Sequence, residues 1–386
     1  MDDGQFLANQ PLVIDNGSQT LRSGIAGASE PGIVFDTCVG RTKHDRVMAG
    51  GALDSGPRKD AFVGRAMHDH RGLMRLHWAM RHGQVMSWSD MEFVWQHMYE
   101  AGGLTSEDHP ILLTEPPLNP GSQRLRTAQV FFETFNVPAA FFATPAVLSL
   151  YAAGKTTGLA LDVGDGVAHC VPVYEGFALD SAVMRSDLAG GDVTDFLQLL
   201  LRKQGVKLMT SAEREIVREI KEKHAFVSPN QTDTAPSGTA AAPDMPESRD
   251  YRLPDGQKIT LETRTLGRAP ELLFRPHIWA SEERGVHQLV ADAVARSDMD
   301  LRAVLFQSIV LSGGATHTRG FGDRLLAELK TTVPGSTKLR IFAPPNRAST
   351  AWTGGSILAG LSTFKKMWAT AAEWEESPER VLLKGI

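Results

Sequence analysis

The sequence has few of the features that mark secreted or membrane-spanning proteins. Its two cysteines, Cys38 and Cys170, are too few for a disulfide framework and are typical of a reducing compartment, where we expect both to be buried. No apolar run approaches the roughly 18–20 residues that span a membrane. The first ten residues, MDDGQFLANQ, are acidic and lack the apolar core of a signal peptide. We therefore expect a cytoplasmic protein.

Several motifs that identify enzymes from sequence are also missing. There is no Walker A loop, no GxGxxG fingerprint, no HExxH, no cysteine and histidine cluster with zinc spacing, and no GxSxG. The formal net charge is −5, so nothing in the overall charge favours a nucleic-acid partner. These absences argue against a serine hydrolase and against a transition-metal site.

What the sequence does contain is a weak internal repeat. The stretch LVIDNGSQTLRSGIAG at 12–27 and the stretch LALDVGDGVAHCVPVYEGF at 159–177 each begin with an apolar run that ends in Asp-x-Gly, followed by a second apolar run. This pattern predicts two hairpins. Because 386 residues exceed what one simple core accommodates, we expect two similar lobes.

Glycine turns at strand ends indicate a phosphate site. Without a Cβ atom, a turn can bring backbone N–H groups close to phosphate oxygens. Asp15 and Asp162, at the two hairpins, can face a hydrated Mg²⁺ that bridges such oxygens. A third turn, with Gly313 and Gly314 in IVLSGGATHTRGFGDRLL, lies between a predicted strand and a predicted helix. Each turn alone is a weak signal, but three together predict a nucleotide site.

Apolar periodicity between the hairpins predicts helices, and strands that alternate with helices indicate an α/β fold. We expect one helix to begin at Asp90 as N-cap, another to open with a capping box from Thr210 to Glu213, and a third to cover 356–368. The glycine-rich, charged segment 46–62 is expected to be a surface loop. Disorder is expected over 228–250, which is rich in Pro, Ser, Thr and Ala.

Longer segments resemble a known family. The following stretches are similar to the actin family across nearly the full chain: VIDNGS, RGLM, HPILLTEPPLNP, FETFNVPA, AVLSLYAAGKTTG, GDGVAH, EREIVREIKEKHAF, IVLSGGAT and WTGGSILAGLSTFKKMW. The resemblance implies the actin-like fold, with two RNase H-like lobes and with ATP or ADP and Mg²⁺ in the cleft. It places an outer lobe at 1–150 plus 344–386, with a small insert at 39–75. The inner lobe would be 151–343, with a small insert at 189–281.

Within this family, VFFETFNVPA, LLLRKQG, APELLFRP, SDMDLR, GFGDRLL and TFKKMW are most similar to the centractin branch, which forms the short filament of dynactin, the cofactor of cytoplasmic dynein. The resemblance implies a nucleotide-bound filament protomer in the cytoplasm and cytoskeleton that supports dynein-driven transport along microtubules. Its partners would be further copies of itself, dynactin subunits, capping proteins and dynein. Two alternatives stay open: a dynamic actin-type ATPase filament, and a non-polymerising nuclear scaffold.

The resemblance also assigns roles to residues. Asp15 and Asp162 would act on the cation through water, and His169 would position the attacking water, with Asp162 beside it. Lys221 and Glu222 would meet the adenosine. The other positions that the resemblance places at the nucleotide are Ser18, Gln19, Thr20, Arg22, Gly164, Asp165, Gly166, Val167, Gly190, Gly313, Gly314, Ala315 and His317.

One departure from the family pattern bears on hydrolysis. Pro145 stands where the family has a glutamine that positions water, and proline has no side-chain donor or acceptor. It suits the first turn of a helix, with Thr144 as cap. Losing a water-positioning group commonly lowers a rate by ~10²–10⁴-fold. The resemblance therefore implies weak or impaired ATPase activity.

Other departures affect the nucleotide and assembly surfaces. At the nucleotide, Gln19 stands in place of glycine and is expected to crowd the phosphates. The other departures there are Arg22 in place of lysine, Val163 in place of serine, and Ala348 and Ser349 in place of larger side chains. The segment 46–62 corresponds to the family's subunit-contact loop. The segment 275–287 corresponds to the plug between strands of the filament, with Ile278 and Trp279 expected as an exposed apolar pair.

Overall fold

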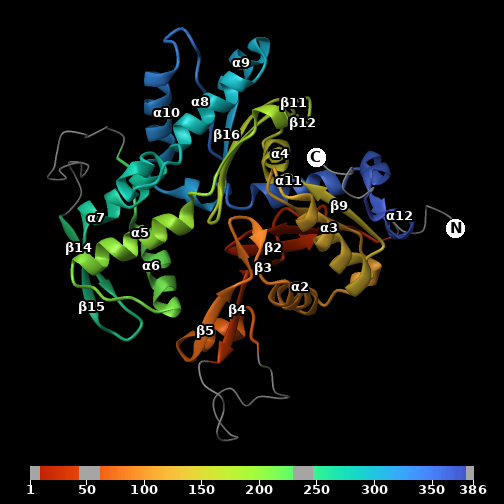
Figure 1. Ribbon diagram of the computed structural model, residues 1–386, viewed down its shortest axis with the longest axis horizontal. Helices are drawn as coiled ribbons and strands as arrows, with labels where there is room; N and C mark the ends of the chain where they lie inside the picture. Colours follow the sequence, from red (N-terminus) through yellow and green to blue (C-terminus); the bar gives the residue numbers. More distant parts are fainter. Residues whose placement is uncertain (1–8, 43–60, 229–246, 380–386) are drawn as a thin grey trace, which may run out of the picture. The chain divides into compact units, whose positions relative to one another are not determined.

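The computed structural model describes residues 9–42, 61–228 and 247–379 (Figure 1). Their contacts divide into two compact units, residues 9–142 with 359–379 and residues 143–358. Each unit contains one six-stranded mixed sheet, and helices accompany both sheets, so the predicted α/β class is confirmed. The lobe boundaries that the resemblance implies, after residues 150 and 343, stay a prediction.

The first unit is organised by the sheet β18-β9-β8-β1-β2-β3. Its strands are β1 (Leu12–Asn16), β2 (Thr20–Ile25), β3 (Ile33–Asp36), β8 (Ile111–Thr114), β9 (Ala139–Ala143) and β18 (Ala369–Thr370). β1 pairs antiparallel with β2 and parallel with β8, and Leu12 lies opposite Ile25 on one side and Ile111 on the other. The first predicted hairpin is thereby confirmed.

Short strand pairs and helices surround this sheet. They are β4 (Cys38–Thr42) with β5 (Met74–Trp78), β6 (Met80–Arg81) with β7 (Gln84–Val85), α1 (Arg65–Asp69), α2 (Trp88–Gly102), α3 (Gly121–Gln129), a π-turn (Val130–Thr134) and α12 (Ala371–Glu376), with 3₁₀ turns at Arg71–Leu73, Ser106–Asp108 and Ser362–Met367. The apolar face of α2 is fully buried, with Trp95 against Phe131 at a ring-centroid distance of 4.6 Å.

The second unit repeats the arrangement of the first. Its sheet runs β12-β11-β10-β16-β17, with β13 paired to β11, and its strands are β10 (Gly158–Val163), β11 (Ala168–Tyr174), β12 (Phe177–Ala178), β13 (Met184–Ser186), β16 (Ile309–Ser312) and β17 (Ile341–Phe342). β10 pairs antiparallel with β11 and parallel with β16. A hairpin whose first strand also has a parallel neighbour thus occurs in both units, which confirms the internal repeat.

Most helices belong to the second unit. They are α4 (Pro145–Ala152), α5 (Gly190–Lys203), α6 (Ser211–His224), α7 (Thr263–Arg268), α8 (Val286–Arg296), α9 (Met299–Phe306), α10 (Phe321–Thr332) and α11 (Thr350–Ala359), with 3₁₀ turns at Asp180–Ala182, Pro270–Leu273, Pro276–Trp279 and Gly314–His317. A separate hairpin, β14 (Ser248–Arg252) with β15 (Lys258–Glu262), lies near α5, α6 and α7 in Figure 1.

Three local predictions are wrong. Helix α2 has Ser87 as N-cap, whose Oγ accepts from Asp90 N at 3.3 Å, so Asp90 lies in the first turn and pairs with Arg41. The helix expected over 356–368 begins earlier, at Thr350, and ends at Ala359, because a glycine at 360 favours termination and a 3₁₀ turn follows.

The third wrong prediction concerns the segment 275–287. Ile278 and Trp279 are half-buried and pack against the core of their own unit, where Trp279 stacks on Phe196 of α5 at 5.6 Å between ring centroids. They are not an exposed apolar pair, because the unit itself provides the partner for the indole ring. Of the predicted loop at 46–62, the structure describes only residues 61 and 62. Of the predicted disorder at 228–250, it describes residues 228 and 247–250, and the disorder does not extend to 248–250, which begin strand β14.

Candidate functional site

The first glycine turn joins β1 to β2 in the first unit. Asp15, at the end of β1, is only 8% exposed, and its carboxylate accepts a hydrogen bond from Thr114 Oγ1 at 3.0 Å. The guanidinium of Arg22 lies 3.6 Å from the same carboxylate. Thr114 also accepts from Asn16 N at 2.9 Å. The buried charge of Asp15 is thereby compensated within this unit, and its role toward Mg²⁺ stays a prediction.

Gly17 and Ser18 form the tip of this turn. A Cβ atom at residue 17 would lie 2.6 Å from the carbonyl oxygen of Thr20, so the tight turn requires glycine. Ser18 Oγ accepts from Gly83 N at 3.0 Å, and Thr37 Oγ1 donates to the carbonyl of Gly17 at 2.8 Å. The tip is therefore attached to two neighbouring segments of the same unit.

Gln19 follows the tip, and its side chain lies inside the unit. The residue is 7% exposed; Gln19 Nε2 donates to Asp36 Oδ1 at 3.4 Å, and Gln19 Oε1 accepts from Trp78 Nε1 at 3.2 Å. The side chain therefore packs beneath the turn, which differs from the expectation that it crowds the phosphates. Thr20 and Arg22 follow on β2.

The second glycine turn joins β10 to β11 in the second unit. Gly164 N donates to Val167 O at 2.9 Å and closes the turn. The first amides of α5 then donate to its carbonyls, Gly190 N to Gly164 O at 3.0 Å and Gly191 N to Asp165 O at 2.8 Å. A Cβ atom at residue 190 would lie 3.0 Å from Gly164 O and 3.4 Å from the Cβ of Ala315. Predicted residues from three separate segments are therefore neighbours here.

Lys221 of α6 also lies at the second glycine turn. Its Nζ donates to the carbonyl of Gly190 at 2.8 Å and lies 4.0 Å from Asp165 Oδ1. Burial lowers the pKa of this ammonium, and the Asp165 carboxylate opposes that shift. Glu222 differs, because its carboxylate is largely exposed and pairs with Arg218 at 3.1 Å. A buried cation beside a glycine turn suits an anionic ligand.

The third glycine turn approaches the second one closely. Gly313 has φ +86°, and a Cβ atom there would lie 2.3 Å from Val163 O and 2.4 Å from Asp162 Oδ1. The next residue, Gly314, faces open space, and His317 is exposed. Arg347 holds the turn, donating from Nε to Thr316 Oγ1 at 3.0 Å, and its carbonyl accepts from Gly313 N at 2.9 Å.

Asp162 and His169 face each other across the β10–β11 pair. The distance from His169 Nε2 to Asp162 Oδ2 is 3.3 Å, and the two residues are 2% and 9% exposed. Among the described residues, neither ring nitrogen of His169 has a hydrogen-bond partner of good geometry. Both ring nitrogens are therefore positioned to form hydrogen bonds with a small ligand such as water.

Pro145 begins α4 as predicted, with Thr144 as the N-cap residue, although the Thr144 side chain makes no capping bond. One turn later, Ser149 Oγ donates to the carbonyl of Pro145 and contacts Ser312 Oγ, both at 2.8 Å. Ser312 Oγ lies 3.0 Å from Thr350 Oγ1. Sequence reasoning missed these buried hydroxyls, which tie α4 to the end of β16 and the start of α11.

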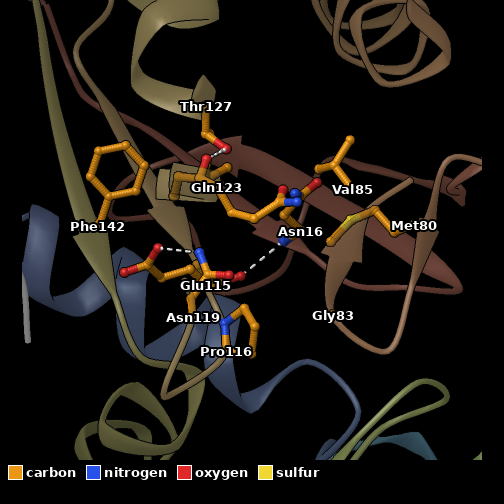
Figure 2. A pocket seen from close by; sticks show the side chains of 12 residues that line it. Asn16, Met80, Gly83, Val85, Glu115, Pro116, Asn119, Gln123, Thr127 and Phe142 are labelled. Carbon is orange, nitrogen blue, oxygen red and sulfur yellow. Dashed lines mark hydrogen bonds between the residues drawn. The ribbon is translucent and has the colours of Figure 1, made fainter. Parts of the chain in front are cut away.

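Sequence reasoning also missed a small hollow in the first unit (Figure 2). Its wall comes from the end of β1, the loop after β8 and helix α3. Within the described part of the chain, three amide oxygens there lack a hydrogen-bond partner: Asn16 Oδ1, Asn119 Oδ1 and Gln123 Oε1. Asn119 Nδ2 donates to Glu115 Oε2 at 3.0 Å. No motif marked this hollow, because its polar residues are scattered through the sequence.

The side chains and backbone amides at the glycine turns suit an anion with a hydrated cation better than a metal ion bound directly by side chains. Over residues 9–42, 61–228 and 247–379, no three side chains of His, Cys, Asp or Glu form a metal-binding group. Mg²⁺ commonly keeps several waters and uses only one or two carboxylates, so single aspartates such as Asp15 and Asp162 are compatible with it. We call the close approach of the segments that carry Gly164, Gly190 and Gly313 the cradle. A Cβ atom at residue 190 or 313 would press against the backbone of a neighbouring segment, so these segments need glycine to approach one another.

Comparisons with known proteins agree with this architecture. The family model described as Actin matches residues 6–385. An "Actin-like protein" of Neurospora crassa is 49% identical over 380 residues, which cover 98% of each chain. No helix among the described residues is long and apolar enough to cross a membrane. The match over almost the whole length shows that this chain belongs to the actin family.

Proposed function

We propose that this chain binds ATP or ADP with Mg²⁺ and assembles into a short cytoskeletal filament. Members of the actin family generally bind these nucleotides with Mg²⁺, self-associate into filaments and are typically cytoskeletal. The phosphates are proposed to bind at the turns of the two hairpins and at the Gly313–Gly314 turn. Asp15 and Asp162 are proposed to contact the waters of the cation.

One observation carries the proposal: the cradle in the second unit. The turn at Gly164–Asp165, the start of α5 and the turn at Gly313 lie within van der Waals distance of one another, and Lys221 adds a buried positive charge. Glycine at these positions keeps side chains out, and the nearby cation favours a polyanion. A nucleoside polyphosphate is the ligand class that fits both features.

The finer proposal is a filament of the dynactin type, supported by the centractin-like segments quoted above. Purification of the native protein from its own cells, followed by mass spectrometry, tests it. We expect dynactin subunits, capping proteins and dynein to co-purify. Recovery of a dispersed monomer, or of a nuclear complex without any of these, would contradict it. Sedimentation and electron microscopy then distinguish a short filament from a non-polymerising scaffold.

A second candidate is a filament that hydrolyses ATP as it turns over. It is favoured by His169, a buried imidazole 3.3 Å from Asp162 without other partners among the described residues. It is opposed by Pro145, which supplies no side-chain group to orient water. Phosphate release measured during polymerisation separates the two: slow release supports a stable short filament, and release that keeps pace with assembly supports the dynamic one.

A further inference from the structure

We propose that Gln19 is a positioning residue that holds the Gly17–Gln19 turn in its ligand-ready conformation before any nucleotide binds. This inference rests on the proposed nucleotide function and deepens it. Gln19 lies at a position where the actin-family resemblance leads one to expect glycine, so this device belongs to the present chain rather than to the family pattern.

The Gln19 amide uses both of its ends. Gln19 Nε2 donates to the carboxylate of Asp36 at 3.4 Å, and Gln19 Oε1 accepts from the indole N–H of Trp78 at 3.2 Å. Indole can only donate and an ionised carboxylate can only accept, so these two partners together require a side chain with one donor and one acceptor end. Glutamine meets that requirement, and glutamate, leucine and glycine do not.

The partners of Gln19 are themselves held in place. Asp36 is 8% exposed and ends β3, and its second oxygen lies 3.0 Å from His68 Nε2 of helix α1. Trp78 ends β5 and packs against the small cluster of Cys38, Met67, Met74 and Leu76. The amide of Gln19 is therefore anchored to two separately packed elements, which makes it a rigid support and not a flexible surface contact.

The backbone of the turn is fastened by the same segment. Thr37, next to Asp36, donates from its amide to Gln19 O at 2.9 Å and from its hydroxyl to Gly17 O at 2.8 Å. Gln19 itself does not have a positive φ, so the backbone does not need glycine there. A glutamine also reduces the freedom of the unfolded turn relative to glycine. Four hydrogen bonds, to Asp36, Trp78 and Thr37, thus fix the turn.

A fixed turn has a measurable consequence. When a binding loop is already ordered, the ligand does not have to supply the free energy of ordering it, so affinity rises mainly through slower dissociation. We therefore expect the amide of Thr37 to be equally protected from hydrogen exchange with and without bound nucleotide. Loss of the Gln19 side chain should make that protection depend on nucleotide.

The test uses the full-length protein loaded with a fluorescent ATP analogue and Mg²⁺. Gln19→Leu removes both hydrogen bonds at nearly constant volume and should raise the dissociation rate about tenfold, because one of the two bonds goes to a charged group. The matched control is Gln96→Leu, an exposed glutamine of α2 that bonds Glu100 at 3.0 Å, which should leave the rate unchanged.

A charge swap separates positioning from general damage. Gln19→Glu places a second carboxylate beside Asp36 and should raise dissociation, whereas the double variant Gln19→Glu with Asp36→Asn restores a donor and acceptor pair and should return the rate toward wild type. Melting temperatures of all variants show whether the fold is intact.

The outcomes distinguish the two proposals. Suppose that the wild type binds nucleotide and that the nucleotide dissociation rates of Gln19→Leu and Gln19→Glu lie within twofold of the wild-type rate. The role assigned to Gln19 is then wrong, and the proposed function stands. Failure of the double variant to rescue, with both singles folded, also contradicts the positioning role. If the wild type binds no nucleotide at all, the proposed function fails, and the inference that depends on it fails too.

Discussion

At the scale of single residues, Gly313 is a position in the second unit that has no room for a side chain. A Cβ atom would come within 2.4 Å of both Val163 O and Asp162 Oδ1, and φ is +86°. We expect Gly313→Ala to lower the free energy of unfolding by about 2–3 kcal/mol. The neighbouring Gly314 faces open space, so Gly314→Ala should change it by less than about 0.5 kcal/mol. Urea denaturation of both variants provides the measurement, and equal midpoints would contradict the close approach.

Pro145 is the residue that sets the expected hydrolysis rate. Proline cannot orient water, so Pro145→Gln should raise phosphate release from bound ATP by about tenfold or more, since a water-positioning group commonly contributes ~10²–10⁴-fold. Pro145→Ala removes the ring without adding a polar group and should leave the slow rate unchanged. An increase in both variants would show that the proline ring, and not the missing amide, limits the reaction.

At the scale of elements, Arg324 joins α10 to the turn at Pro270–Leu273. It is 1% exposed and donates to Glu271 at 2.6 and 2.9 Å, to Glu328 at 2.8 Å and to the carbonyl of Ser228 at 2.9 Å. Arg324→Met would leave Glu271 and Glu328 without their main counter-charge, and we expect a loss of about 3–5 kcal/mol. Arg296→Met, at an exposed arginine, is the control. Similar unfolding midpoints for the two variants would contradict this assignment.

His287 of α8 gives the second unit an expected pH dependence. Burial lowers the pKa of this imidazole from its usual 6.5. Below pH 6.5 the unfolded chain therefore takes up a proton that the folded chain resists. The free energy of unfolding thus decreases as the pH is lowered, by at most about 1.4 kcal/mol per pH unit from this group. His287→Asn should remove that part of the slope in denaturation midpoints between pH 7 and pH 5.5. The same change at the exposed His277 should leave the slope unaltered.

Local signals predicted some helix boundaries and missed others for identifiable reasons. The capping box at Thr210 is present, with Glu213 N donating to Thr210 Oγ1 at 3.2 Å and Thr210 N to Glu213 Oε2 at 2.7 Å, because every partner lies within one turn. Helix α2 began earlier than expected because Ser87, three residues before Asp90, supplies the cap. The burial of Trp279 depends on Phe196 of α5, and a contact so distant in sequence leaves no local pattern.

At the scale of the whole molecule, the repeated hairpins allowed the fold class and much of the candidate site to be predicted. Asp-x-Gly at a strand end favours a tight turn formed by neighbouring residues alone, so this pattern predicts a hairpin without any knowledge of distant contacts. The hollow beside Asn16, the hydroxyls around Ser149 and the inward side chain of Gln19 were missed. They arise where elements far apart in sequence meet, which residue spacing does not encode.

The central claim is that this chain holds one adenine nucleotide with Mg²⁺ through its glycine turns. The most direct measurement is the nucleotide content of the natively purified protein, released by acid and quantified by chromatography, followed by rebinding of ATP with and without Mg²⁺. The account predicts about one ATP or ADP per chain and rebinding that needs Mg²⁺. Protein that is folded, carries no nucleotide and binds none when ATP and Mg²⁺ are added would contradict it.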